Sequence, residues 1–172
     1  MHNDTTNPTT PVLRRPDPVE VRRAIDRRSF ATLATSSPAG RPHVAGVLYE
    51  AVDDALYVST MRPSRKARNI EANPDVAVVI PIRRLPVGPP STVQFQTTAT
   101  VLDSDGPEIQ ALVAAGELTS ITGHGELELA GGCFLRIALP RRLVTYGLGM
   151  PIRALISDPL SGGGLVELEA RA

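Results

Sequence analysis

The segment spanning residues 59–66, Ser-Thr-Met-Arg-Pro-Ser-Arg-Lys, combines residue types that can hold a negatively charged group. It follows an apolar run, turns at its proline, and places Arg65 and Lys66 where a helix begins. The first turn of a helix has backbone N–H groups without partners, and the helix dipole favours negative charge there. Arginine adds a planar fork of donors and lysine a point charge. We call this segment the phosphate cradle and predict that it binds a phosphate through residues among Ser59, Thr60, Met61, Ser64, Arg65 and Lys66.

Two positive charges at the start of a helix are unfavourable unless an anion offsets them. Without one, Arg65 and Lys66 should each cost about 0.3–1 kcal/mol. This misfit favours a bound anion over the alternative, a solvated helix start with no ligand. The helix ends at Asn73, because the residue before a proline is disfavoured in the α conformation. Arg68, one turn after Arg65, is interpreted as part of the solvated face of this helix.

The charge balance argues against a polyanionic partner. The chain has 172 residues, with 18 basic and 18 acidic side chains, so no global field attracts nucleic acid or anionic lipid. Basic residues are clustered locally, in the cradle and again at Arg83 and Arg84, which favours a small anionic ligand. The sequence also lacks the stacking aromatics on a basic strand face that single-stranded nucleic acids require. We expect no nucleic-acid partner.

Cysteine and histidine residues are few and scattered. Cys133 is the only cysteine, so no intrachain disulfide can form, and three histidines lack the spacing of a zinc site. His43 at a strand start and His124 between two glycines are interpreted as structural or exposed residues, and Cys133 as a small core residue. No apolar run reaches the roughly 18 residues of a membrane helix, and the N-terminus is not a signal peptide. We therefore expect a cytoplasmic protein without membrane contact.

Hydrophobic periodicity predicts one mainly β domain at residues 16–156, between a disordered lead at 1–15 and a C-terminal tail at 157–172. Helices are predicted from Pro18, with Asp17 as the N-terminal cap, after the cradle, and over 106–115. Short helical turns are expected over 117–131. The predicted strands are 30–36, 43–51, 55–60, 76–80, 92–102 and 133–139. This pattern is typical of a small closed or half-closed β-barrel with flanking helices.

Two of these strands carry further predictions. Residues 76–80 form a continuous apolar run, which indicates a strand buried on both faces. Residues 133–139 are predicted to be the last strand, and the glycine-rich tail after Asp158 is not placed.

The order of these elements, with the cradle after the third strand, resembles the split β-barrel of the pyridoxamine 5′-phosphate oxidase-like flavoproteins. The resemblance covers about residues 29–146. It is strongest at Ser-Arg-Lys-Ala, 64–67, followed by Glu-Ala-Asn-Pro-Asp-Val, 71–76, and Gly-Arg-Pro-His, 40–43, supports it. It implies an FMN-binding homodimer with the cofactor at the interface.

The resemblance also implies roles for individual residues. Arg65 and Lys66 would bind the FMN phosphate, with Ser59 and Thr60 beside it. The strand 44–49, with Val44, Val47 and Tyr49, would run under the isoalloxazine ring. The partner subunit would contribute the strand that carries Thr92, Gln94 and Gln96. An alternative for Gln94 and Gln96 is the solvated side of the barrel.

The sequence departs from the true oxidase at two places. Val44 and Tyr49 stand where the oxidase has basic residues, and the chain lacks the C-terminal Arg-Leu-x-Pro substrate motif, so oxidation of vitamin B6 is not expected. Other members of the family use the deazaflavin coenzyme F-420. The segment 144–148, followed by Met150 and Arg153, is similar to some of those, and Arg83 and Arg84 would then receive the acidic tail of the coenzyme.

The leading hypothesis is an FMN-dependent oxidoreductase that transfers hydride between its bound cofactor and an unknown small substrate. The cofactor supplies the reactive ring, and the polypeptide binds and orients it, so no side chain need act as acid or base. One alternative is a deazaflavin-dependent reductase of the same fold. Another is a flavin- or haem-binding protein without catalytic activity.

Overall fold

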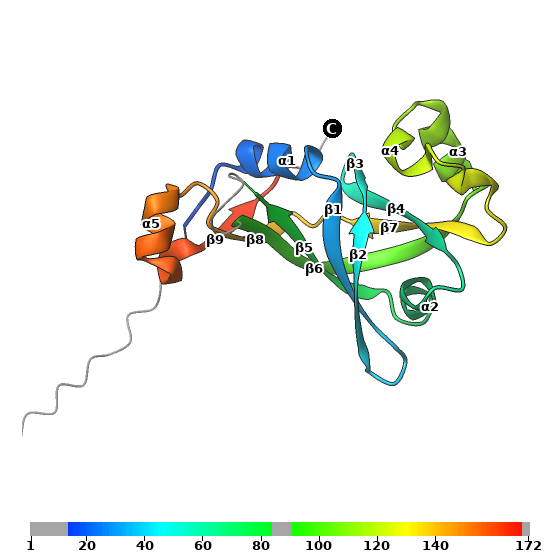
Figure 1. The fold of residues 1–172 in the computed structure, drawn as a ribbon, viewed down its shortest axis with the longest axis horizontal. Coiled ribbons are helices and arrows are strands. Elements are labelled where there is room, and N and C mark those ends of the chain that lie inside the picture. Colours follow the sequence, from blue (N-terminus) through cyan, green and yellow to red (C-terminus); the bar gives the residue numbers. More distant parts are fainter. Residues whose placement is uncertain (1–13, 84–90, 170–172) are drawn as a thin grey trace, which may run out of the picture.

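β-Strands dominate the structure, a computed structural model that describes residues 14–83 and 91–169 (Figure 1). In chain order the elements are α1 (Pro18–Asp26), β1 (Phe30–Ser36), β2 (Pro42–Leu48), β3 (Glu50–Val52), β4 (Ala55–Met61), α2 (Arg65–Ala72), β5 (Asp75–Ile82), β6 (Ser91–Asp103), α3 (Pro107–Ala114), α4 (Thr119–Thr122), the 3₁₀ turn η1 (Glu126–Glu128), β7 (Gly132–Ala138), β8 (Arg142–Tyr146), α5 (Ile152–Ser157), the 3₁₀ turn η2 (Pro159–Gly162) and β9 (Gly163–Glu167).

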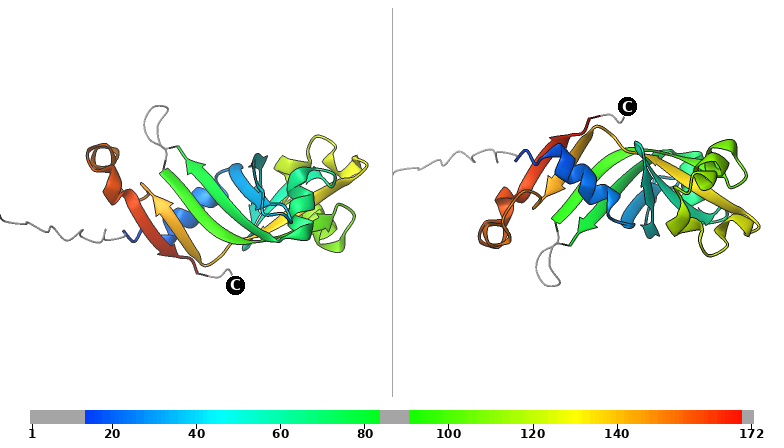
Figure 2. Two further views of the ribbon diagram at one scale, coloured as in Figure 1. Left: turned by 90° about the horizontal axis from the view of Figure 1, so that it is seen from below. Right: turned by 90° about the horizontal axis from the view of Figure 1, so that it is seen from above.

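The described strands form one nine-stranded sheet in the order β2-β1-β5-β6-β7-β4-β3, with β8 paired to both β6 and β9. Neighbouring strands are antiparallel. The long strand β6 pairs with β5 and β8 over its first part and with β7 over its last part, so it joins the two halves of a curled sheet. The helical ends lie far apart: Figure 2 shows α5 at one end of the sheet and α3 with α4 at the other. The predicted mainly β half-barrel with flanking helices is confirmed.

The core is aliphatic and lies inside the curl of the sheet. Its largest fully buried side chains include Leu33, Leu56, Ile80, Leu135 and Ile137. A second cluster, around Phe134 and Ile109, packs α3 and α4 against the other side of β4 and β7. The Tyr57 hydroxyl donates a hydrogen bond of 2.7 Å to Glu108, which ties α3 to the sheet.

The predicted start of α1 is confirmed. The Asp17 side chain caps the helix by accepting a hydrogen bond from the Val19 N–H at 3.0 Å, and Pro18 occupies the first turn. Two residues of this helix, Val21 and Ile25, are fully buried. α1 contacts both β3, at one end of the sheet path, and β9, which lies off that path beside β8.

Three strand predictions need correction. The strand predicted at 43–51 is two strands, because the chain leaves the sheet at Tyr49 and enters a second pairing at Glu50. The prediction that 76–80 is buried on both faces is wrong: Val76, Val78 and Ile80 are buried, whereas the side chains between them are half-exposed. Residues 133–139 are not the last strand, because β8 and β9 follow.

At both ends of the chain, the structure contains strand pairing that the sequence did not predict. Residues 163–167, within the predicted tail, form β9 and pair with β8. At the other end, Arg14 bridges to Gly164, with its N–H donating to the Gly163 carbonyl at 3.0 Å. The remaining lead, 1–13, lies outside the described residues. Within the described ranges, none of the helices has both the length and the apolar character needed to cross a membrane.

Replacing Tyr49 with phenylalanine is expected to lower the free energy of unfolding by about 1 kcal/mol, because the buried Ile25 carbonyl then loses the hydroxyl that donates to it at 2.8 Å. Burial raises the pKa of Tyr49 above its usual value of 10.0. The neutral phenol therefore contributes stability below about pH 10, and this contribution is lost as the pH rises further. Urea unfolding at pH 7 and at alkaline pH measures both effects.

The phenylalanine variant should lose less stability than the wild type between neutral and alkaline pH, because only the wild type has this phenol to ionise on unfolding. Identical alkaline losses in the two proteins would contradict this account of Tyr49.

Candidate functional site

The start of α2 is built as the cradle prediction requires. Ser64 is the N-terminal cap: its hydroxyl accepts a hydrogen bond from the Ala67 N–H at 3.4 Å, and its carbonyl accepts one from the Arg68 N–H at 3.1 Å. Among the described residues, the backbone N–H groups of Arg65 and Lys66 have no hydrogen-bond partner. The first turn contains no acidic side chain. Two free N–H groups and two cations therefore meet at one helix end.

The cations of the cradle differ from their neighbour Arg62. Arg62 forms ion pairs with Glu71 and Asp103, so its charge is already satisfied within the chain. Arg65 and Lys66 have no carboxylate partner within 4.0 Å among the described residues. Their charges are available to a ligand, and the arrangement can hold an anion such as a phosphate.

The structure brings only some of the predicted cradle residues together. The hydroxyls of Thr60 and Ser64 lie 3.5 Å apart, so both reach the helix start. Successive side chains of a strand point to opposite faces, which places Ser59 and Met61 on the other face of β4. Met61 is 38% exposed there. Side-chain contact with a bound phosphate is therefore expected from Thr60 and Ser64 more than from Ser59 and Met61.

The residues predicted to lie under a cofactor ring are divided between the two faces of the sheet. Val44 is 61% exposed on the face that points away from the core. Val47 and Tyr49 are buried in the core, and the Tyr49 hydroxyl is used by Ile25. The alternation along β2 and the break after it therefore separate these side chains, and of the three only Val44 is exposed.

We call the surface of β2, β1, β5, β6, β8 and β9 that points away from the core the outer face. The strand register aligns Val44, Ala34, Ala77 and Gln96 in one row across it. The side chains at the centre of the outer face are small or neutral, and they are half-exposed or exposed. A pocket of about 450 Å³ lies on this face between β5, β6 and β8, and it is lined by Ala77, Val78, Val79, Gln94, Phe95, Gln96, Arg142 and Val144.

Gln94 and Gln96 are brought to the outer face together with Thr92, whose hydroxyl accepts a hydrogen bond of 2.8 Å from Gln94. Gln96 lies three strands away from Val44, which is roughly 14 Å at the usual strand spacing. The glutamines and Val44 therefore lie on the same face but not side by side.

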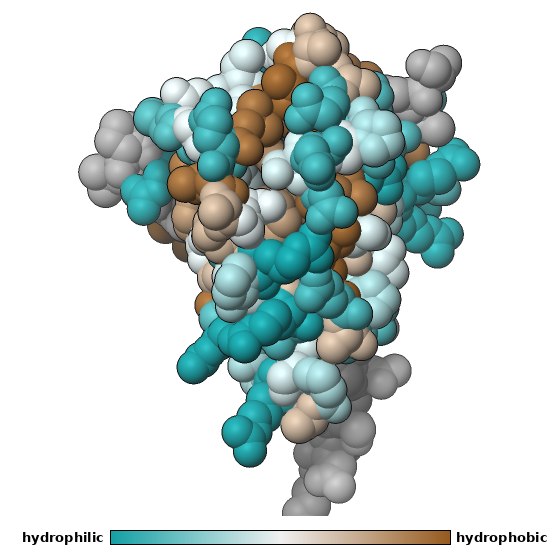
Figure 3. Space-filling view, turned by 90° about the vertical axis from the view of Figure 1, so that its right-hand side faces the viewer, coloured by the Kyte–Doolittle hydropathy of each residue, from teal (hydrophilic) through white to brown (hydrophobic). Residues whose placement is uncertain are grey.

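Sequence reasoning did not foresee which residues surround Arg65. Its side chain lines a pocket of about 480 Å³ between α2 and the β1–β2 hairpin, together with Arg41, His43 and Asn69. The sequence indicated the hairpin turn, but only the pairing of β1 with β2 and their packing on α2 show that these side chains converge. Figure 3 views this end of the molecule, where hydrophilic side chains gather over the middle of the face.

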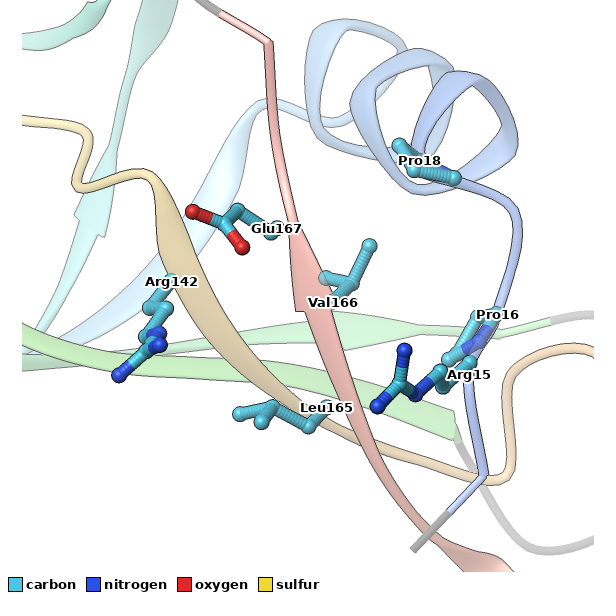
Figure 4. Close-up of a pocket in the computed structure, with 7 residues that line it drawn as sticks. All are labelled: Arg15, Pro16, Pro18, Arg142, Leu165, Val166 and Glu167. Atoms are coloured by element: carbon cyan, nitrogen blue, oxygen red, sulfur yellow. The ribbon is translucent and has the colours of Figure 1, made fainter.

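A separate pocket of about 410 Å³ lies near α1, β8 and β9 (Figure 4). Arg15 and Arg142 contribute positive charge to it, and Glu167 contributes a carboxylate beside Arg142 on the neighbouring strand. Its charges are partly balanced, unlike those of the pocket beside the cradle. Arg83 is exposed, whereas Arg84 lies outside the described residues.

None of the described histidines or carboxylates forms a cluster of three that could hold a metal ion. The His124 side chain is 86% exposed and lies 3.7 Å from Glu126, which fits the surface role predicted for it. No side chain among the described cradle residues is arranged as a paired acid and base.

Cys133 is expected not to react with thiol reagents in the folded protein. It is 1% exposed and pairs with Thr60 directly behind the cradle. Burial raises the pKa of the Cys133 thiol, although the nearby charges of Arg62 and Lys66 lower it, and the thiol rather than the reactive thiolate is favoured at neutral pH. Labelling at about pH 8 should consume one equivalent in urea and almost none without it. Rapid labelling of the folded protein would contradict this prediction.

Solved structures share this fold at low sequence identity. The haem storage protein HutZ from Vibrio cholerae superposes with a TM-score of 0.64 at 23% identity, covering 76% of this chain and 95% of that one. A FAD-binding protein from Mesorhizobium loti gives 0.59 at 23%, covering 72% and 87%. A haem-binding protein from Mycobacterium smegmatis gives 0.64 at 19%, covering 80% of this chain but 57% of that one. No curated protein sequence matches the chain.

A sequence-family model gives a more direct assignment. The model described as pyridoxamine 5′-phosphate oxidase matches residues 18–124, which is more than half of the 172 residues. The match spans α1, the β1–β2 hairpin, the cradle and β6. It confirms the resemblance drawn from the Ser-Arg-Lys segment, and the chain belongs to the pyridoxamine 5′-phosphate oxidase family.

Proposed function

We propose that this chain is an FMN-dependent oxidoreductase that works as a homodimer on a small-molecule substrate. One observation carries the proposal: Arg65 and Lys66 begin α2 with free backbone N–H groups and, among the described residues, without a carboxylate partner. This donor set matches the chemistry of a phosphate, which accepts several charged hydrogen bonds at a helix N-terminus. Family membership supports the assignment of that phosphate to a flavin-type cofactor.

The residues that would hold the cofactor belong to two groups. Arg65, Lys66, Ser64 and Thr60 would bind the phosphate. Val44 and the apolar side chains beside it on the outer face, Phe30 and Leu48, would contact the ring; they are 61%, 45% and 60% exposed. When bound, a flavin supplies the hydride chemistry itself, and the polypeptide orients it and excludes water.

The homodimer is proposed from the outer face. Its central side chains are small or neutral, and several are apolar and exposed, including Val44, Val144 and Leu165. A two-fold interface buries the same surface on both subunits. In this arrangement the partner's Gln94 and Gln96 would face the ring that is held at the cradle of the first subunit.

There are two alternatives to an FMN-dependent oxidoreductase. The first is a deazaflavin-dependent reductase, for which the same cradle would hold the coenzyme phosphate. The second is a flavin- or haem-binding protein without catalytic activity. The relatives described as haem-binding and haem storage proteins favour testing the latter, and His43 beside Arg41 and Arg65 offers a nitrogen ligand near two cations.

The test is a spectroscopic titration of the purified protein with FMN, coenzyme F-420 and haemin. FMN should bind with a Kd below roughly 100 µM, the weakest affinity that fits a dedicated site. Tight binding of the deazaflavin or of haemin, without FMN binding, would replace the leading proposal with the matching alternative. A reduced FMN complex that passes no hydride to oxygen or to quinones would favour the non-catalytic role.

A further inference from the structure

The pocket of about 410 Å³ near α1, β8 and β9 lies at a free edge of the sheet (Figure 4). Two short segments supply most of its lining: 15–18, which leads into α1, and 165–167 of β9. We call it the edge pocket. Successive side chains of a strand point to opposite faces, and here Leu165 and Glu167 are exposed whereas Val166 is buried. Because residues of both kinds line the pocket, it follows the edge of β9 and not one of its faces.

Among the described residues, the chain covers this edge of β9 at one position. Arg14 forms a parallel bridge with Gly164. Its N–H donates to the Gly163 carbonyl at 3.0 Å, and its carbonyl accepts from the Leu165 N–H at 2.9 Å. In a parallel ladder the next donor toward β9 would be two residues further along, at position 16. That residue is Pro16, which has no N–H, so the pairing stops where the chain turns into α1.

Beyond that bridge, β9 presents open backbone groups to the edge pocket. The Leu165 N–H points to Arg14, so the alternation of an antiparallel pair directs the backbone groups of Leu165 and Glu167 away from β8. The next N–H, of Leu168, donates to the Arg141 carbonyl at 2.7 Å on the β8 side, as this alternation requires. Among the described residues, the Leu165 carbonyl and the Glu167 N–H have no hydrogen-bond partner. They are a successive acceptor and donor on an open strand edge.

The charges that line the edge pocket leave a positive charge over. Glu167 and Arg142 are opposite each other in the strand register, so their charges offset each other in part. The exposed Arg15 has no carboxylate partner within 4.0 Å among the described residues. In Figure 4 its side chain extends from the segment before α1 toward β9. A cation without a partner therefore accompanies the open backbone groups.

We propose that the edge pocket binds an extended, acidic segment of another polypeptide, which adds to β9 as a short strand. The Leu165 carbonyl accepts from a backbone N–H of this segment, the Glu167 N–H donates to one of its carbonyls, and Arg15 pairs with its acidic side chain. Peptides that add to a sheet edge gain affinity from such main-chain hydrogen bonds and specificity from side-chain contacts. A volume of about 410 Å³ lies within the range of ligand sites, about 300–1,000 Å³. The inference is independent of the proposed function, because none of these residues belongs to the cradle.

The probe is a fluorescently labelled hexapeptide of threonine and valine with a single central glutamate, a composition that favours extended chains. Its binding to the full chain is measured by fluorescence anisotropy. One comparison peptide has glutamine in place of the glutamate, and another has methylated backbone nitrogens. Glu167→Pro removes the N–H of the edge, and proline is tolerated on edge strands where the N–H faces solvent. Glu167→Thr is the matched control, because it loses the same carboxylate but keeps the N–H.

The wild type should bind the glutamate peptide with a Kd below roughly 1 mM, and Glu167→Thr should bind it at least as tightly. Glu167→Pro should bind it about tenfold more weakly, because one main-chain hydrogen bond is lost and a peptide carbonyl is left unpaired. Arg15→Ala should weaken binding by about threefold, the effect of one exposed ion pair, and the glutamine peptide should show the same loss. Arg23→Ala removes an exposed arginine of α1 that does not line the pocket, and should have no effect.

Several results would overturn the inference. A wild type that does not bind the glutamate peptide, or a folded Glu167→Pro protein that binds it equally well, would show that β9 receives no added strand. The methylated peptide tests the same hydrogen bonds without changing the protein, and its equal binding would rule out main-chain pairing even if Glu167→Pro fails to fold. Equal binding of the glutamine peptide would show that the segment is not recognised by its charge. A lower molecular mass of Glu167→Pro without peptide, measured by light scattering, would show that a second copy of this chain occupies the edge.

Discussion

Replacing Arg65 and Lys66 together with alanine is expected to weaken FMN binding by about 2–4 kcal/mol, or roughly 30- to 900-fold in Kd. Each side chain would lose a charged hydrogen bond to the phosphate, and the two losses are not fully additive because both contact the same group. The free N–H groups at the start of α2 remain, so binding should weaken without being abolished. Fluorescence titration of FMN into each protein measures the change.

The fold should tolerate this double replacement. Both side chains lie at the helix start and oppose the helix dipole, so alanine there should preserve or slightly raise the free energy of unfolding. Arg23→Ala with Arg27→Ala is the matched control, because it removes two exposed arginines from α1 and its C-terminal cap. An FMN affinity unchanged by the cradle replacement would show that the phosphate lies elsewhere.

Replacing Val79 with aspartate is expected to convert the proposed homodimer to monomers and to remove cofactor binding. Val79 lies at the centre of the outer face, where its strand neighbours are Thr32 and Gln94. A two-fold interface would bury this carboxylate twice, once on each subunit, without a counter-charge. The dimer dissociation constant should therefore rise by a factor of at least about 100. Light scattering with size exclusion measures the molecular mass, and FMN titration measures the coupled loss.

The control is Leu160→Asp, since Leu160 is 89% exposed in η2 and lies off the outer face. It introduces the same charge and should change neither mass nor affinity. A Val79→Asp protein that is monomeric yet binds FMN with wild-type affinity would mean that the partner contributes nothing to the site. A Val79→Asp protein that remains dimeric would place the interface on another surface.

Several elements could be predicted from the sequence because short-range effects determine them. The Asp17 cap and Pro18 define the start of α1, and Ser64 caps α2 through a hydrogen bond three residues along the chain. The turn at Asp53, with a φ of 50°, joins β3 to β4 where two adjacent aspartates indicate a turn. Caps, turns and alternation act within a few residues, so a single sequence displays them directly.

Other features depend on contacts between distant residues. β8 and β9 are short, and β9 contains two glycines, so their strand character comes from pairing with each other and with β6. The sequence likewise does not show which side of β5 is buried. Its central residues are all apolar, so their types do not distinguish the side that faces the core from the exposed side. The resemblance implies a place for Tyr49 under the cofactor ring, whereas its hydroxyl donates to the Ile25 carbonyl, 24 residues away in α1.

The Ser-Arg-Lys segment by itself determined that two cations stand at a helix start, because neighbouring residues create this arrangement, and the proposed anion site rests on it. The sequence also determined the family, through that segment and the order of elements around it. Only the tertiary structure decided what surrounds Arg65: Arg41, His43 and Arg65 converge because β1 and β2 pair and pack on α2. It also separated Val44 from Gln96 across the outer face. Such convergence depends on how the sheet curls and closes, which no local pattern encodes.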